Sequence, residues 1–164
     1  MSGINFDKYI AVCKEAVKDE SIFNNFRNIK DYVGVVDNIT KEFGEEYLHI
    51  IEKDYPQLLM YMDKFITNEN IGTPNTCFKY DRLHTIISTT TLRYIKILGD
   101  LIKLFGKLDN INIVELGGGY GGQCKIIYDV CTPKSYTLID LPDALALSKK
   151  CLNLWGVNNV NFCD

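Results

Sequence analysis

The chain has 164 residues, of which 46% are hydrophobic and 24% charged, and its formal net charge is −3. This length suits one domain, and the apolar fraction is too high for a disordered chain. The mildly acidic balance argues against a nucleic-acid-binding surface, which needs clustered Lys and Arg. No apolar stretch reaches the ~20 residues that span a bilayer, and residues 1–7 lack the pattern of a secretory signal. We therefore expect a soluble, cytoplasmic protein whose partners include neither nucleic acid nor a membrane.

The six cysteines are scattered along the chain without a C-x-x-C pair, and the sequence has two histidines. Their spacings match no zinc finger or zinc ribbon. Reduced, buried thiols are the better interpretation than disulfides or a metal centre. The sequence therefore predicts no metal site.

Residues 1–106 are predicted to form a helical cap region. Apolar side chains recur three and four positions apart over residues 6–17 and again over residues 47–65, which is typical of amphipathic helices. The second stretch is expected to break near Tyr55–Pro56, where Pro56 suits a first helical turn. Residues 68–75 (NENIGTPN) are rich in turn formers and predict a loop.

A long helix is predicted over residues 83–105. Its apolar face includes Leu83 and Ile87, and Gly106 is a suitable stop. The STTT run at residues 88–91 lowers helix propensity, so this helix is expected to kink or split there.

Residues 107–164 predict an incomplete Rossmann-like α/β domain. The run INIVEL is short and almost continuously apolar, as expected for a strand buried on both faces of a parallel sheet. Strands and helical stripes then alternate, which is typical of half of a doubly wound fold. The predicted strands are residues 111–116, 135–139 and 159–163, and the predicted helices are residues 124–131 and 142–155.

The most informative motif is ELGGGYGG, which begins at Glu115 and follows the first predicted strand. Gly117, Gly119 and Gly122 match the G-x-G-x-x-G spacing of nucleotide-binding turns. Glycines there allow positive φ and let the backbone approach a ligand closely where a strand turns into a helix.

The residues around the glycines favour one class of nucleoside cofactor. No Gly-Lys-Ser/Thr follows, which excludes a P-loop. A pyrophosphate is disfavoured beside Glu115, whereas the cationic amino group of S-adenosylmethionine suits that carboxylate. The glycines also fit E-x-G-x-G-x-G through Gly121. Asp140 ends the second predicted strand, where a carboxylate can accept hydrogen bonds from ribose or cap the following helix.

Two stretches resemble a known family. IVELGGGYGGQ (residues 113–123) and YTLIDLP (residues 136–142) resemble motifs I and II of class I S-adenosylmethionine-dependent methyltransferases. Within that superfamily the chain is most similar to sugar O-methyltransferases, in which the triple-glycine loop and the D-L-P motif are typical. The TLRY sequence at residues 91–94 also fits that family. The resemblance is specific over residues 88–164 and general over the part before them.

The resemblance implies a cofactor, an acceptor and a set of binding residues. The cofactor is S-adenosylmethionine, and the acceptor is a small molecule, a sugar or glycan hydroxyl. The glutamate contacts the methionine moiety, the glycines line the cofactor, the aspartate holds the ribose and the leucine packs beside the adenine. These cofactor-binding residues are Glu115, Gly117, Gly118, Gly119, Gly121, Asp140 and Leu141.

The resemblance implies a larger sheet, of which this chain is expected to supply three strands. It also implies that the catalytic residues lie in the half that the chain is expected to lack, so the sequence assigns no catalytic residue. His84 as a general base is a weaker hypothesis than an ordinary structural role, whereas Tyr120 suits a substrate contact and aromatic packing equally. The glycine-bearing strand is expected at an open sheet edge, which favours a homo-oligomer or another partner that covers it.

The main interpretation is a methyltransferase of which this chain is a truncated form. Two alternatives remain open. One is a non-catalytic S-adenosylmethionine-binding or interaction module derived from such an enzyme. The other is a fragment of an NAD-binding oxidoreductase, which Glu115 disfavours.

Overall fold

Helices dominate the first hundred residues of the structure, a computed structural model that describes residues 6–164. The predictions of helices over residues 6–17 and 47–65 are confirmed, and so is the predicted break near Tyr55–Pro56, where a 3-10 helix begins at Pro56. The segment compared with secretory signals lies mostly outside the described residues. The helices are α1 (Phe6–Lys18), α2 (Glu20–Phe23), α3 (Lys30–Val33), α4 (Lys41–Asp54), α5 (Met62–Phe65) and α6 (Thr89–Phe105), with 3-10 helices at Phe26–Asn28, Pro56–Tyr61 and Ile66–Asn70.

The prediction that a long helix starts near residue 83 is wrong. Strands β1 (Cys77–Tyr80) and β2 (Thr85–Ser88) form an antiparallel hairpin that contains Ile87, and α6 begins only at Thr89. The β-branched residues before Ser88 suit a strand. The Ser88 side chain then caps α6 by accepting a hydrogen bond from the Thr91 N–H at 3.1 Å. Gly106 ends α6, as predicted.

The last third of the chain alternates strands and helices. It comprises β3 (Asn112–Leu116), α7 (Gly122–Tyr128), β4 (Ser135–Ile139), α8 (Pro142–Leu154) and β5 (Asn161–Cys163). The three strands are parallel and lie in the order β3-β4-β5, so β3 is at the edge of the sheet. The predicted order of elements is therefore confirmed, and the chain is an α/β protein with a small additional hairpin.

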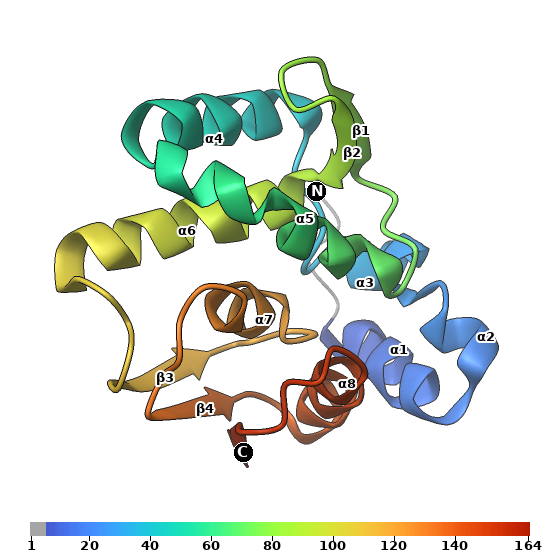
Figure 1. Ribbon diagram of the computed structural model, residues 1–164. Coiled ribbons are helices and arrows are strands. Elements are labelled where there is room, and N and C mark those ends of the chain that lie inside the picture. Colours follow the sequence, from blue (N-terminus) through green and yellow to red (C-terminus); the bar gives the residue numbers. More distant parts are fainter. Residues whose placement is uncertain (1–5) are drawn as a thin grey trace.

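The helices are stacked on one side of the parallel sheet (Figure 1). Helix α7 lies against the sheet, α6 crosses above α7, and α4 packs on the far side of α6, while α1 lies beside α8. The buried side chains form one cluster that includes Leu48, Leu92, Ile126 and Leu138, which belong to different layers. Within residues 6–164, no helix is both long and apolar enough to cross a membrane.

A buried arginine connects the N-terminal helices to the glycine-rich loop. The Arg27 side chain is fully buried, and its Nε donates a hydrogen bond to Asp37 Oδ2 at 2.9 Å. Its Nη1 donates to the Asn68 carbonyl at 2.9 Å and lies 3.5 Å from Glu69 Oε2. The guanidinium also lies 4.4 Å from the centre of the Tyr120 ring. The Arg27 side chain therefore contacts three segments that are distant in sequence, those of Asp37, Asn68 and Tyr120.

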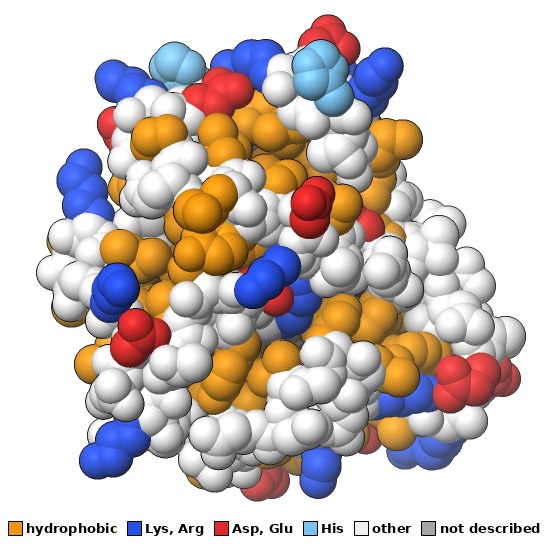
Figure 2. All heavy atoms as spheres, in the orientation of Figure 1, with side chains coloured by type: hydrophobic (Ala, Val, Ile, Leu, Met, Phe, Trp, Pro, Cys, Tyr) orange, Lys and Arg blue, Asp and Glu red, His pale blue; other side chains and the backbone are white. Residues whose placement is uncertain are grey.

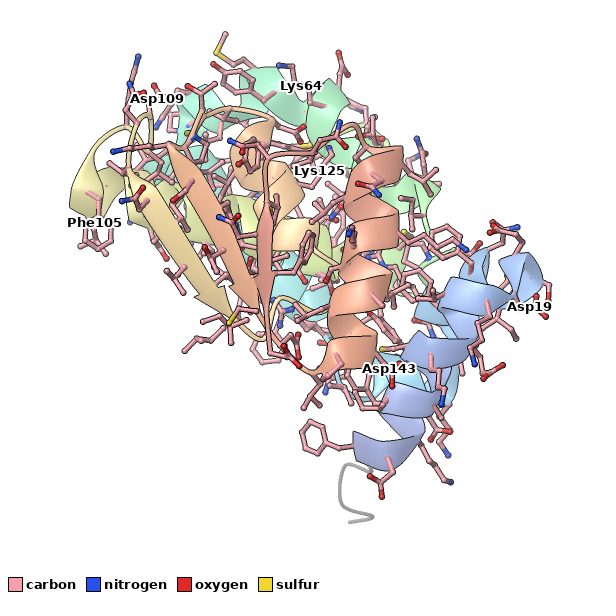
Figure 3. The ribbon with its side chains drawn as sticks, turned by 90° about the horizontal axis from the view of Figure 1, so that it is seen from below. Asp19, Lys64, Phe105, Asp109, Lys125 and Asp143 are labelled. Atoms are coloured by element: carbon pink, nitrogen blue, oxygen red, sulfur yellow. The ribbon has the colours of Figure 1, made fainter. Side chains whose placement is uncertain are left out.

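The outer face of the sheet is uncovered, contrary to the prediction that β3 is buried on both faces. Figure 3 shows the three strands from the side on which no helix covers them. Val114 is 62% exposed and Leu116 is 76% exposed, whereas Ile113 and Glu115 point toward the helices and are partly buried. The apolar run in the sequence did not distinguish these two faces. All the helices that follow these strands lie on one side of the sheet, so the other side has no cover.

We expect the chain to associate with a second copy through β3, whose outer edge pairs with no other strand among the described residues. A strand edge leaves backbone N–H and C=O groups unpaired, and Val114 adds an exposed apolar side chain. Light scattering should therefore report particles larger than a monomer. Val114→Lys should shift them toward the monomer because a charge on the edge opposes pairing, whereas Met60→Lys, at a 76% exposed position elsewhere, should not. A monomeric wild-type chain would contradict this expectation.

Candidate functional site

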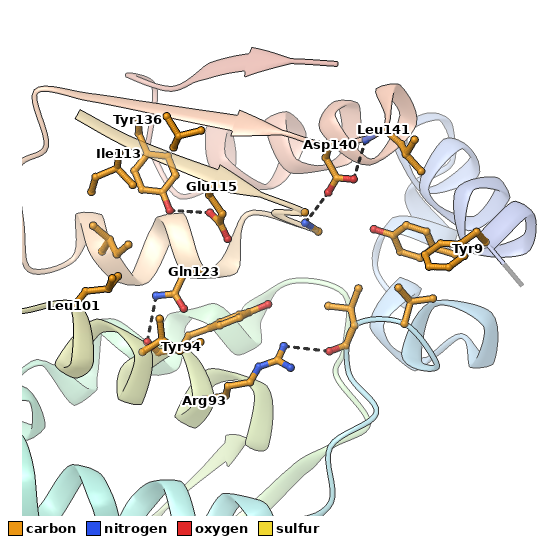
Figure 4. Close-up of a pocket in the computed structure, with 18 residues that line it drawn as sticks. Tyr9, Arg93, Tyr94, Leu101, Ile113, Glu115, Gln123, Tyr136, Asp140 and Leu141 are labelled. Carbon is orange, nitrogen blue, oxygen red and sulfur yellow. Dashed lines mark hydrogen bonds between the residues drawn. The ribbon is translucent and has the colours of Figure 1, made fainter. Parts of the chain in front are cut away.

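A pocket of about 550 Å³ opens at the carboxyl end of β3. The sheet and α7 form one wall, and α6, α1 and the segment after α3 form the others (Figure 4). Its volume is in the range of small-molecule sites. The pocket is lined by Phe6, Tyr9, Val35, Val36, Arg93, Tyr94, Ile97, Leu101, Ile113, Val114, Glu115, Gly117, Gly119, Gln123, Ile127, Tyr136, Asp140 and Leu141.

The glycine loop lines one side of this pocket, where Gly117 and Gly119 expose main-chain atoms because they have no side chain. Gly117 and Gly119 have φ angles of 73° and 57°, which L side chains rarely adopt. A Cβ placed on Gly117 would meet no atom within 4 Å, so the space beside it is open to a ligand. The loop is held at Gly119, whose N–H donates to Asp140 Oδ2 at 3.0 Å and whose carbonyl accepts from the Ser148 hydroxyl at 2.6 Å.

Gly118 and Gly121 lie outside the lining of the pocket. A Cβ on Gly118 would come within 2.4 Å of the Leu138 side chain, and one on Gly121 within 2.9 Å of Leu152. These two glycines therefore let the loop pack closely against β4 and α8, whereas Gly117 and Gly119 border the open space.

Glu115 projects from β3 into the same pocket. Its Oε2 accepts a hydrogen bond of 2.7 Å from the Tyr136 hydroxyl, and Oε1 accepts none from residues 6–164. Burial raises the pKa of the Glu115 carboxyl, the Tyr136 hydrogen bond opposes the rise, and the negative charge of Asp140 adds to it. Burial and the charge of Glu115 raise the pKa of Tyr136, which therefore keeps its proton and acts as the donor. An ionised Glu115 lacks a cationic partner within the described chain.

Asp140 stands at the end of β4 and holds the turn around the site. Its Oδ2 accepts from Gly119 N–H, and its Oδ1 accepts from the Leu141 N–H at 2.7 Å. The N-cap residue of α8 is Leu141, so Asp140 does not cap that helix by position. Each carboxylate oxygen can accept more than one hydrogen bond, so both keep capacity for a ligand. Leu141 lines the pocket and is 48% exposed.

Two polar side chains from the helices also line the pocket, Arg93 from α6 and Gln123 from α7. Arg93 on α6 lies across from Glu115 and Asp140 (Figure 4), and its Nη2 donates a 3.5 Å hydrogen bond to the Val36 carbonyl. Gln123 on α7 donates from Nε2 to the Tyr94 carbonyl at 3.2 Å. Its Oε1 is buried without a hydrogen-bond partner in the described part of the chain.

His84 and Tyr120 lie elsewhere. His84 is exposed in the turn of the β1–β2 hairpin and does not line the pocket. Tyr120 is fully buried; Asn68 donates to its hydroxyl at 3.1 Å, and Arg27 lies over its ring. Tyr120 is therefore part of the core, and the hypothesis that it contacts substrate is wrong for this arrangement.

Five of the seven cofactor-binding residues predicted from the sequence line one pocket: Glu115, Gly117, Gly119, Asp140 and Leu141. Other lining residues were not predicted. Gln123 directly follows the glycine loop and Arg93 lies in the TLRY motif, so both were within reach of sequence reasoning. Tyr9 on α1 carried no such signal. The residues so missed are Tyr9, Arg93, Tyr94, Gln123 and Tyr136.

The arrangement suits a ligand that carries positive charge near β3 and hydroxyl groups near β4. The pocket has the Glu115 carboxylate on β3 and the Asp140 carboxylate at the end of β4, with the main chain of the glycine loop between them. Its other walls are mostly apolar. Charged side chains of both signs are interspersed on the face shown in Figure 2, and no basic patch appears there. Comparison of the sequence with protein-family models and with curated proteins finds no match.

Proposed function

We propose that this chain binds S-adenosylmethionine and forms the cofactor-binding part of an O-methyltransferase whose acceptor is a sugar hydroxyl. The observation that carries the proposal is the Glu115 carboxylate, which is partly buried in the pocket and has no cationic partner within residues 6–164. The amino group of the methionine moiety would supply that charge. The resemblance of residues 88–164 to sugar O-methyltransferases supports the same cofactor and suggests the acceptor.

The residues present fit the cofactor. Gly117 leaves the space beside its Cα open, Glu115 faces the methionine end, and Asp140 has acceptor capacity for ribose hydroxyls. Leu141 and the other apolar lining residues would contact the adenine. When bound, the sulfonium supplies the methyl group, which an acceptor oxygen attacks in line. The residues of this chain would hold the cofactor in the orientation that this in-line attack requires.

The nicotinamide alternative fits the same pocket less well. A dinucleotide brings a pyrophosphate dianion to the glycine loop, close to Glu115. A carboxylate beside a dianion repels it, and removal from water strengthens this repulsion. Asp140 does not separate the two cofactors, because a carboxylate at this position can hold the ribose of either. The non-catalytic alternative shares this cofactor and differs from the proposal only in that no methyl group is transferred.

Calorimetric titration of the purified chain tests the proposal. S-adenosylmethionine and S-adenosylhomocysteine should both bind, and NAD should not. Binding of NAD with no response to either adenosyl ligand would refute the proposal. Transfer of a labelled methyl group to a mixture of sugars then separates an enzyme from a binding module.

A further inference from the structure

The Arg93 guanidinium lines the pocket and pairs with no carboxylate of the described residues. Arg93 forms no ion pair with any acid of residues 6–164, and its one hydrogen bond, to the Val36 carbonyl, is 3.5 Å long. By contrast, Arg27 pairs with Asp37, and Arg82 pairs with Glu45 and Glu52. Arg93 therefore keeps most of its five N–H donors available to something in the pocket.

The pocket also holds an acceptor without a donor. Gln123 is only 7% exposed, and its Oε1 lacks a hydrogen-bond partner in the part of the chain that the structure describes. The Nε2 bond to the Tyr94 carbonyl fixes which end of the amide carries the oxygen. In Figure 4 the Glu115 side chain enters the pocket from β3, and the Gln123 amide extends from α7 toward Tyr94 on α6. A buried acceptor left unpaired costs about 1–3 kcal/mol, so such an atom indicates a missing donor.

These groups have the charge pattern of a receptor for an α-amino acid. Glu115 supplies an acceptor from β3, Gln123 supplies one from α7, and the donors of Arg93 lie on α6, across the pocket from Glu115 (Figure 4). An ammonium needs acceptors, and a carboxylate is matched by the planar donors of a guanidinium.

We propose that Arg93 binds the carboxylate of the ligand's amino-acid end, and that Gln123 Oε1 joins Glu115 in accepting hydrogen bonds from its ammonium. This inference rests on the proposed function, because it assigns the amino-acid end of the proposed cofactor to these residues. It makes the pocket selective for ligands that carry both charges. Neither residue is assigned a role in the chemistry of transfer.

The test compares three ligands by calorimetry: S-adenosylhomocysteine, its decarboxylated analogue and its deaminated analogue. Arg93→Met should weaken binding of the parent and the deaminated ligand by about 10- to 100-fold, the range for hydrogen bonds to charged groups, and leave the decarboxylated ligand unchanged. Gln123→Leu should weaken the parent and the decarboxylated ligand and leave the deaminated one unchanged. Arg93→Lys should recover part of the loss.

Lys96→Met on the same helix is the matched control, because Lys96 pairs with Asp100 and does not line the pocket. It should change none of the three affinities. Equal binding of all three ligands by the wild-type chain would overturn the inference even if either variant fails to fold, and would leave the proposed cofactor intact. Uniform weakening of all three ligands by Arg93→Met would also overturn it. Failure of the wild-type chain to bind any adenosyl ligand would instead overturn the proposed function.

Discussion

Replacing Arg27 with methionine is expected to lower the free energy of unfolding by about 3–5 kcal/mol. Methionine keeps the apolar stem but removes the charge, so Asp37 is left fully buried without its partner and Glu69 loses its nearest cation. The Asn68 carbonyl also loses its donor. Urea unfolding monitored by circular dichroism measures the change.

Arg82→Met provides the matched control. Arg82 forms ion pairs with Glu45 and Glu52, but its side chain is 43% exposed. Exposed pairs contribute little, so this loss should stay within about 1 kcal/mol. Adding Asp37→Asn to Arg27→Met should restore part of the stability, because it removes the uncompensated charge. Equal losses at the two arginines would show that burial of the pair has no special consequence.

Replacing Glu115 with glutamine is expected to stabilise the free protein and to abolish most of its cofactor binding. The folded state disfavours the ionised carboxylate, because burial raises its pKa, whereas glutamine carries no charge and can still accept from Tyr136. The melting temperature should therefore rise at neutral pH. Affinity for S-adenosylmethionine should fall by about 2–5 kcal/mol, the range for removing one partner of a buried charge pair.

The pH dependence of the Glu115 effect has a defined direction. Below the ordinary pKa of 4.5 the carboxyl is protonated in both folded and unfolded states, so the variant and the wild type should be equally stable. As pH rises from 4.5 to the raised pKa of the folded state, only the unfolded wild type releases its proton, and the wild type loses stability relative to the variant. Above that pKa the difference should be constant. Cofactor affinity of the wild type should increase over the same interval, because the ammonium favours the ionised form.

The control for this variant is Glu46→Gln, which makes the same chemical change at an exposed position on α4 outside the pocket. Neither its melting temperature nor its cofactor affinity should differ from the wild type. A destabilised Glu115→Gln variant would contradict the view that this carboxylate is kept for a ligand at a cost in stability.

The order of elements after residue 110 could be predicted from the sequence, because local signals marked each one. Short apolar runs marked the strands, Pro142 marked the start of α8, and Gly106 and the glycine loop marked the ends of elements. Glu115 and Asp140 follow from the same signals, because parallel strands place their carboxyl ends at one edge.

The features that the sequence did not predict depend on contacts between distant segments. Ile87 fits the apolar face of a helix by spacing, but pairing with β1 places it in a strand. Val114 is apolar, yet its side of β3 is open because the helices all lie on the other side. Arg93 and Gln123 reach the pocket because α6 crosses above α7, an arrangement that no local pattern encodes.

The burial of Tyr120 beneath Arg27 has a consequence for how this molecule unfolds. The ring belongs to the glycine loop, and it contacts Arg27 and Asn68 of the N-terminal half as well as Trp155 near the end of the chain. Heat or denaturant that loosens those helices should also release the loop backbone, so that hydrogen exchange at Gly119 and Gly121 reports on the distant helices. The ligand cradle and the helices that enclose it would then melt as one cooperative unit.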